Sequence, residues 1–176
     1  MKYFRTENRA RRTSWGQASV EMALVFGTVV VPSVFGLLMV AQAVWTWGSV
    51  VHLTRLGAKY AATHCWQDAS GSNVVNYMQS NAPPMMDRQQ LVTGAAQILV
   101  QYWTQDGANH QTVPFDCAES CTAACVPDAV TVTVSGYRMG GLPQVLRLGT
   151  LGMPDFSTTM QVESAGGNPD TGQPVP

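Results

Sequence analysis

Four cysteines and one histidine have the side-chain types that could support metal binding or disulfide chemistry. Cys117, Cys121 and Cys125 follow a C-x₃-C-x₃-C spacing, and Cys65 follows His64 directly. These five side chains could supply four zinc ligands, but structural zinc sites usually show paired cysteine knuckles or histidine pairs. Two disulfides are the stronger prediction if this part of the chain lies in an oxidising compartment.

The pairing of the cysteines is left open by their spacing. Four cysteines allow three pairings, and each joins Cys65 to one member of the cluster and leaves one short bridge within it. The long bridge would close a loop of roughly 50–60 residues, worth on the order of 4 kcal/mol in the chain-entropy model. We expect it to attach a small domain to the helix that precedes Cys65.

The other polar residues predict no enzymatic activity. The sequence contains no G-x-S-x-G, H-E-x-x-H or glycine-rich phosphate loop. The histidines have no partner pattern and are expected on the helix surface or in a loop: His52, His64 and His110. Asp116, Glu119 and Asp128 lack the spacing of an EF-hand and would bind Ca²⁺ only weakly. No cofactor and no metal are predicted.

A single carboxylate, Glu21, stands at the start of a long apolar run. No charged residue lies between Glu21 and Arg55, and Met22 to Ala41 contains no strongly polar side chain. Twenty helical residues span roughly 30 Å, about the hydrocarbon thickness of a bilayer. A helix is expected because backbone amides in lipid need internal partners. Pro32 removes one amide donor and should kink or locally loosen it.

The charges on either side of this run predict its orientation. Residues 1–16 carry five basic side chains and one acidic one, whereas the remaining residues carry five basic and ten acidic ones. By the positive-inside rule the basic head is cytoplasmic and the chain after about Val51 is extracytoplasmic, where disulfides persist. Trp45 and Trp47 would lie in the aromatic belt at the membrane surface. A basic head before an acidic body does not indicate nucleic-acid binding.

Three interpretations of the N-terminus follow. A secretory signal peptide could be cut after Ala43, within the small-x-small site that starts at Ala41, but its apolar core would be unusually long. An uncleaved signal anchor would place Glu21 near a helix N-terminus, where a negative charge suits the helix dipole. The third interpretation depends on the order of the residues around Gly16.

The string Gly16-Gln17-Ala18-Ser19-Val20-Glu21-Met22-Ala23-Leu24 resembles the processing motif of type IV prepilins. It is most similar to the TadE-like pseudopilins of tight-adherence (Tad/Flp, type IVc) pili. Thr54 to Ala62, with the sequence TRLGAKYAA, also resembles the R-x-G-A-R-Y-A-A segment that follows the span in those proteins. The resemblance is strong for residues 16–62 and loose beyond them.

The resemblance implies a function and a set of partners. A prepilin peptidase would cut between Gly16 and Gln17, and Glu21, then the fifth residue, would pair with the N-terminal amine of a neighbouring subunit. Such a pairing compensates a charge that is otherwise unfavourable in a membrane. The implied partners are the peptidase, other pilin subunits, the inner-membrane assembly platform and the bilayer. The implied role is pilus assembly, with surface adhesion and biofilm formation.

The chain after the span predicts a small α+β domain. Ser72 to Asn81 is a candidate short helix, and Asp87 with Gln90 resembles a capping box. That box is expected to open a helix to about Thr104, with one apolar face. Ala129–Ser135 and Phe156–Glu163 alternate like half-buried strands and are expected to pair antiparallel. Gly140 to Pro154 is left open between strand and helix.

The predicted organisation has four parts. Residues 1–16 form a cleaved cytoplasmic leader, and residues 17–63 form the transmembrane helix and its extension. Residues 64–164 form a disulfide-linked extracytoplasmic domain with a small antiparallel sheet and one or two packing helices. Residues 165–176 have few apolar side chains and are expected to be disordered. The combination of a long helix and a small domain is also similar to the lollipop shape of pilins.

Overall fold

The computed structural model describes residues 16–107, 109, 111–119, 121–122, 125–141, 147 and 149–162. The predicted leader up to residue 15, the C-terminal tail and His110 therefore lie outside the described residues. The chain divides into two units, Met1–Gln42 and Ala43–Pro176.

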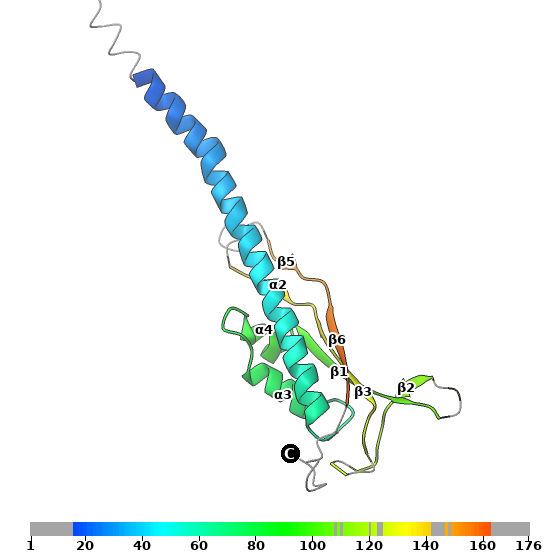
Figure 1. Ribbon diagram of the computed structural model, residues 1–176. Helices are drawn as coiled ribbons and strands as arrows, with labels where there is room; N and C mark the ends of the chain where they lie inside the picture. Colours follow the sequence, from blue (N-terminus) through cyan, green and yellow to red (C-terminus); the bar gives the residue numbers. More distant parts are fainter. Residues whose placement is uncertain are drawn as a thin grey trace, which may run out of the picture. The chain divides into compact units, whose positions relative to one another are not determined.

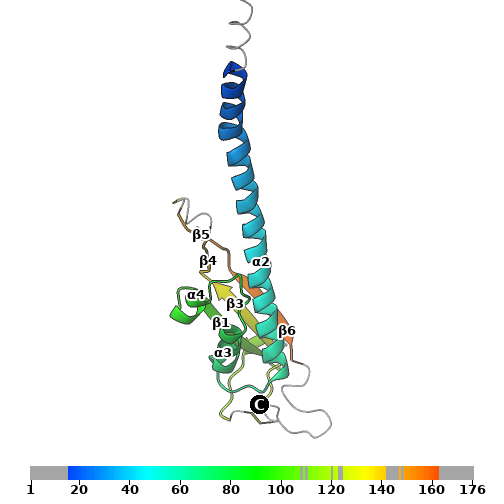
Figure 2. The same cartoon turned by 90° about the vertical axis from the view of Figure 1, so that its left-hand side faces the viewer.

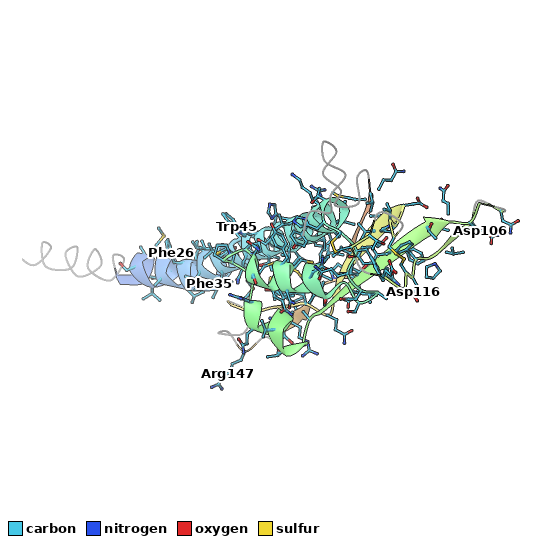
Figure 3. The ribbon with its side chains drawn as sticks, turned by 90° about the horizontal axis from the view of Figure 1, so that it is seen from below. Phe26, Phe35, Trp45, Asp106, Asp116 and Arg147 are labelled. Atoms are coloured by element: carbon cyan, nitrogen blue, oxygen red, sulfur yellow. A yellow bond between two sulfur atoms is a disulfide. The ribbon has the colours of Figure 1, made fainter. Side chains whose placement is uncertain are left out.

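The described part of the first unit is helical from Gly16 onward. It includes the π-helical turn η1 (Phe26–Val30) and the beginning of α2 (Val31–Thr63). The apolar side chains are exposed along its length, and Figure 3 shows Phe26 and Phe35 projecting from the helix. The helix Gly16–Thr63 is long and apolar enough to span a membrane.

The second unit combines the end of α2 with a four-stranded antiparallel sheet. The strands are β1 (Gln97–Gln105), β2 (Thr112–Pro114), β3 (Ala129–Ser135) and β6 (Phe156–Gln161), in the order β2-β1-β3-β6. A two-stranded ribbon of β4 (Arg138–Met139) and β5 (Leu151–Gly152) completes it. In Figure 1 this ribbon and β2 lie at opposite ends of the unit.

Two helices cover one face of the sheet. In Figures 1 and 2, α2 and α3 (Ser72–Ser80) lie on the same face of the sheet. Gly57 of α2 leaves room for Met78 of α3, because an added Cβ would lie 2.3 Å from the sulfur of Met78. A further short helix, α4 (Arg88–Thr93), connects α3 to β1.

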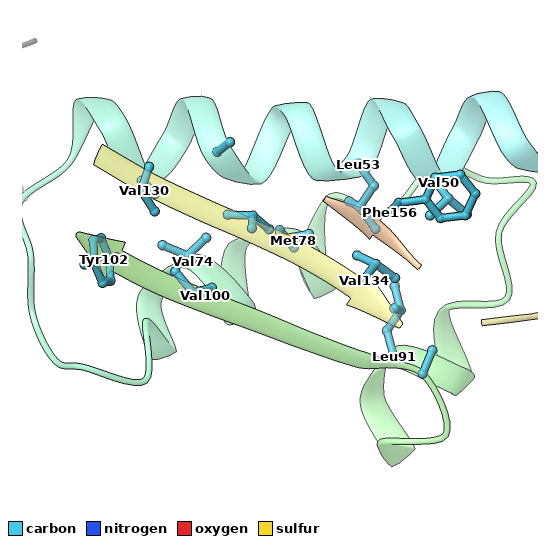
Figure 4. Close-up of a cluster of buried hydrophobic side chains, with 14 of the residues drawn as sticks. Val50, Leu53, Val74, Met78, Leu91, Val100, Tyr102, Val130, Val134 and Phe156 are labelled. Atoms are coloured by element: carbon cyan, nitrogen blue, oxygen red, sulfur yellow. The ribbon is translucent and has the colours of Figure 1, made fainter. Parts of the chain in front are cut away.

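The core of the second unit lies between these helices and the sheet (Figure 4). Every second residue of β3 is buried, as alternation in a strand requires, and Val130, Val132 and Val134 are fully buried. Val50 and Leu53 of α2 and Val74 and Met78 of α3 also have no exposed surface and close the core from the helix side. The opposite face of the sheet carries polar residues, including Thr131, which accepts from Trp103 Nε1 at 3.0 Å.

The expected α+β class, antiparallel pairing and disulfides are confirmed, and one expected element is wrong. The segment 97–105, predicted as the end of a helix, is strand β1. The helix that begins after Asp87 ends at Gly94, whose φ of 77° is favourable only for glycine. The following residues are β-branched or aromatic at several positions and bury Val100 and Tyr102 by alternation.

The capping box is present only in part. The side chain of Asp87 accepts from the backbone N–H of Gln89 at 3.0 Å, as an N-cap should. Gln90 does not return a bond to the Asp87 N–H; its amide donates to Asp87 Oδ2 and to the carbonyl of Arg138. The Asp87 N–H donates instead to the Tyr137 hydroxyl at 2.7 Å.

The segment left open between strand and helix contains a short piece of strand. Leu151 pairs with Met139, and Gly152 pairs with Arg138, in the β4–β5 ribbon. Residues 142–146 and 148 lie outside the described residues.

Candidate functional site

Gly16 and Gln17 lie at the beginning of the described helix, one turn before Glu21. The Gln17 side-chain amide donates to Glu21 Oε1 at 3.4 Å, a long hydrogen bond between residues four positions apart. All three residues are exposed. A cut between Gly16 and Gln17 would place a new ammonium group on the same helical turn as this carboxylate.

The apolar side chains after Glu21 have no cover within the first unit. None of the residues in the most apolar window of the helix is buried. Apart from the half-buried Val30 and Met39, the large hydrophobic residues from Val20 to Val40 are between 41% and 71% exposed, which is the reverse of a soluble core helix. Exposed apolar side chains over such a length indicate an interaction surface.

Pro32 is preceded by a rearrangement of the backbone. Val31 N–H donates to the carbonyl of Phe26, five residues back, which defines the π-helical turn η1. Proline has no N–H, and its ring crowds the carbonyl four residues earlier, here that of Thr28. The hydroxyls of Thr28 and Ser33 donate to the carbonyls of Leu24 and Val29, each at 2.6 Å. The helix is thus locally loosened just before Pro32.

The four cysteines form two disulfides. Cys65 is bonded to Cys121, 56 residues away, and Cys117 is bonded to Cys125, 8 residues away. The long bridge joins the residues after α2 to the loop between β2 and β3, and Cys121 N–H also donates to the Trp66 carbonyl at 2.9 Å. Because each sulfur is bonded to another sulfur, the zinc interpretation does not apply to this structure.

The other polar candidates are dispersed. His52 is exposed, and His64 stacks on Tyr60 with ring centroids 3.7 Å apart. Asp128 Oδ2 accepts from Thr104 Oγ1 at 2.9 Å and from Gln105 N–H at 2.7 Å. The backbone bond from Gln105, followed by that from Thr104, lowers the pKa of Asp128. Within the described residues no three metal-ligating side chains gather, so Asp116, Glu119 and Asp128 form no cluster there.

An apolar groove in the second unit was not identified from the sequence. It has a volume of about 500 Å³ and lies between the first residues of this unit and the β4–β5 ribbon. Its lining residues are Ala43, Val44, Trp47, Met139, Leu151, Gly152, Met153 and Pro154. Trp47 is a signal for this region in the sequence, because an interfacial position is predicted for it. Several of its partners in the groove come from Gly140 to Pro154, the segment that the sequence leaves open between strand and helix.

Comparisons of the chain with protein-family models, with curated proteins and with solved structures find no match.

Proposed function

We propose that this protein is a TadE-like minor pseudopilin of a tight-adherence (type IVc) pilus. A prepilin peptidase cuts it after Gly16, and its N-terminal helix then takes part in pilus assembly at the bacterial inner membrane. The observation that carries the proposal is the constellation of Gly16, Gln17 and Glu21 at the start of an exposed apolar helix. The protein is a substrate of the peptidase and a structural subunit rather than an enzyme.

The electrostatics of Glu21 support the assembly step. A carboxylate at the end of an apolar helix is unfavourable in a membrane unless it has a partner. The Gln17 amide is the hydrogen-bond partner of Glu21 in the uncut chain, at 3.4 Å. A neutral amide compensates a carboxylate less than an ammonium does. The amine released by cleavage in a neighbouring subunit therefore provides the stronger partner and sets the axial register between helices.

The surface of the first helix supports the same role. An added Cβ at Gly27 or Gly36 would meet no atom within 4 Å, so these positions are open to other molecules. Small residues on an apolar helix allow a second helix to approach closely in lipid. The local loosening before Pro32 gives the helix room to adapt to such neighbours.

The first experiment determines the N-terminal residue of the full chain isolated from its native envelope. Cleavage after Gly16 leaves Gln17 first, whereas an uncleaved anchor keeps Met1 and a cut after Ala43 leaves Val44. Gly16→Leu should retain the leader, and Gly27→Leu, the same change within the span, should be processed normally. Recovery of the intact leader on the wild-type protein would exclude the pseudopilin role and favour an anchored envelope protein with a partner-binding domain.

The second experiment separates processing from assembly. Glu21→Gln should still be cut, because Gly16 and Gln17 are retained, but pilus yield on the cell surface should fall at least tenfold. Glu119→Gln makes the same chemical change at an exposed position of the second unit and should leave the yield unchanged. Pili at the wild-type level in Glu21→Gln cells would show that Glu21 does not set the axial register between helices.

A further inference from the structure

The apolar groove formed by Val44, Trp47, Leu151 and Met153 lies at one end of the second unit, which we call the Ala43 end. Its eight lining residues include no charged or hydrogen-bonding side chain other than the Trp47 indole. Val44 is 67% exposed, Leu151 57% and Trp47 50%. Exposed apolar side chains gathered around a groove indicate a partner that covers them.

The chain itself limits how far this groove can lie from the apolar span. Val44 follows Ala41, the last residue of the uninterrupted apolar run, by three positions, and Trp47 follows it by six. At the rise of an α-helix these positions lie roughly 5 and 9 Å beyond the end of the run. The headgroup layer on each side of the hydrocarbon core has a comparable thickness. With the apolar run in the hydrocarbon core, Val44 and Trp47 would fall in the membrane interface.

A second group of apolar residues lies at the same end. Trp45, 64% exposed, lines another groove whose other residues are both apolar and polar: Gly48, Ser49, His52, Asn81, Ala82, Pro83 and Pro84. Tryptophan is the residue most typical of the membrane interface, since its ring is amphipathic. An exposed tryptophan thus lies beside each of the two grooves at the Ala43 end.

The charges of the second unit are distributed unevenly between its two ends. The end opposite to Ala43, where β1 and α2 finish, is the more acidic one. There Lys59, one turn before the end of α2, stands against Asp68, Asp106, Asp116, Glu119 and Asp128. The Ala43 end carries Arg88, Arg138 and Arg147 against Asp87 and Asp155, the last of which follows the groove residue Pro154. Figure 3 shows Arg147 and Trp45 well away from Asp106 and Asp116. Anionic lipid would attract the Ala43 end and repel the acidic end.

We infer that the second unit docks against the surface of an anionic phospholipid bilayer through its Ala43 end. Val44, Trp47, Leu151 and Met153 enter the headgroup and upper acyl region, while Arg138 and Arg147 contact lipid phosphates. The inference rests on the membrane insertion of the N-terminal helix, but not on cleavage or pilus assembly. A second copy of the chain is the competing occupant of the groove.

A photo-crosslinking experiment tests the docking. The full chain, with p-benzoyl-phenylalanine at Leu151, is reconstituted into vesicles of phosphatidylethanolamine and phosphatidylglycerol and irradiated. Position 126 is the matched control, because Val126 is also an exposed apolar residue, 41% accessible, but belongs to the loop between the disulfide cysteines and β3. We expect phospholipid adducts on the peptide that contains position 151, at least tenfold above those at position 126.

Other outcomes overturn the inference. Covalent dimers through position 151 without lipid adducts would show that a second copy of the chain occupies the groove. Equal lipid labelling at positions 151 and 126 would show that the Ala43 end does not face the bilayer. Flotation of the vesicles distinguishes a failure of docking from a failure of membrane insertion. If the protein floats but position 151 is not labelled, docking fails while the span stands; if it does not float, both fail.

The cationic contribution has its own variant. Arg138→Gln retains the backbone bonds of residue 138 with Gln90 and removes only the exposed charge. The lipid adduct yield at position 151 should fall up to about fivefold in the anionic vesicles, the effect of one cation near such a surface. In vesicles of phosphatidylcholine alone, Arg138→Gln and the parent protein should give equal yields. An unchanged yield in anionic vesicles would contradict the contact with lipid phosphate.

Discussion

Single side chains in the second unit show how loops without regular structure are stabilised. Asp68, between α2 and α3, accepts hydrogen bonds from the hydroxyls of Ser70 and Ser72 and from the backbone N–H of Ser72. These bonds, those from the two hydroxyls first, lower its pKa to about 2. The carboxylate orders the turn that leads into α3, where Gly71, at a φ of 61°, approaches Val100.

Asp68→Asn should destabilise the second unit by about 1 kcal/mol, because the amide has one acceptor oxygen where the carboxylate has two. The pKa of Asp68 is lower in the folded than in the unfolded state. Its stabilising contribution is therefore complete above about pH 4 and is lost as the pH falls toward 2. Thermal unfolding, followed by near-ultraviolet circular dichroism between pH 2 and 7, measures both effects.

The difference in melting temperature between the wild type and Asp68→Asn should shrink as the pH approaches 2. Glu119→Gln, an exposed carboxylate within the disulfide loop, is the control and should change the profile little. A constant difference across the pH range would show that folding does not lower the pKa of Asp68.

At the scale of elements, the packing of α2 on α3 depends on the absence of a side chain at Gly57. The added Cβ would lie 2.3 Å from the Met78 sulfur and 2.9 Å from its Cγ, and Met78 is fully buried. A hydroxyl pair adds a polar link between α2 and the sheet: Thr158 Oγ1 donates to Thr54 Oγ1 at 3.1 Å. Thr54 in turn donates to the Val51 carbonyl, so this buried hydroxyl is satisfied.

Gly57→Ala should destabilise the second unit by about 1–2 kcal/mol, although alanine is the better helix former. Gly48→Ala is the matched control, because the new Cβ there meets no atom within 4 Å. It should be neutral or stabilising by up to about 1 kcal/mol. Chemical unfolding of the reconstituted full chain gives both values.

A rescue variant identifies the steric cause. Met78→Ala leaves a cavity that the new methyl group at residue 57 can partly fill, so the double variant should be less destabilised than the sum of the single ones. Strict additivity would show that Gly57 and Met78 do not interact.

At the scale of the whole chain, the disulfides tie together segments far apart in sequence. Cys65–Cys121 has a sequence separation of 56, and Cys117–Cys125 one of 8. In the chain-entropy model the free-energy contribution of a bridge grows with the length of the loop that it closes. The first bridge therefore restricts the unfolded chain much more than the second.

Replacing Cys65 and Cys121 together with alanine should lower the free energy of unfolding by about 4 kcal/mol, and replacing Cys117 and Cys125 by about 2.5 kcal/mol. Pairwise replacement is used so that no free thiol is left to exchange. Denaturant unfolding of the two variants under identical conditions gives the comparison. A larger loss for the short bridge would indicate that native-state packing, rather than loop length, dominates.

Several features of this fold follow from local sequence because their physical causes are local. The apolar run after Glu21 is long enough to predict a membrane-spanning helix by itself. The alternation at Ala129–Ser135 and Phe156–Gln161 identifies β3 and β6, since a half-buried strand has a period of two. The exposed candidates Gly16, Gln17 and Glu21 are recognised by their order along the chain, and nothing in the fold of the second unit bears on them.

Other features were decided only by tertiary structure, since they depend on residues distant in sequence. Residues 97–105 have apolar side chains at both helical and strand spacings, and pairing with β3 along seven positions makes them a strand. Cys65 pairs with Cys121 because the end of α2 and the loop between β2 and β3 lie at the same end of the second unit. The groove at the Ala43 end exists because β4 and β5 fold back beside Trp47, a contact that neither segment specifies alone.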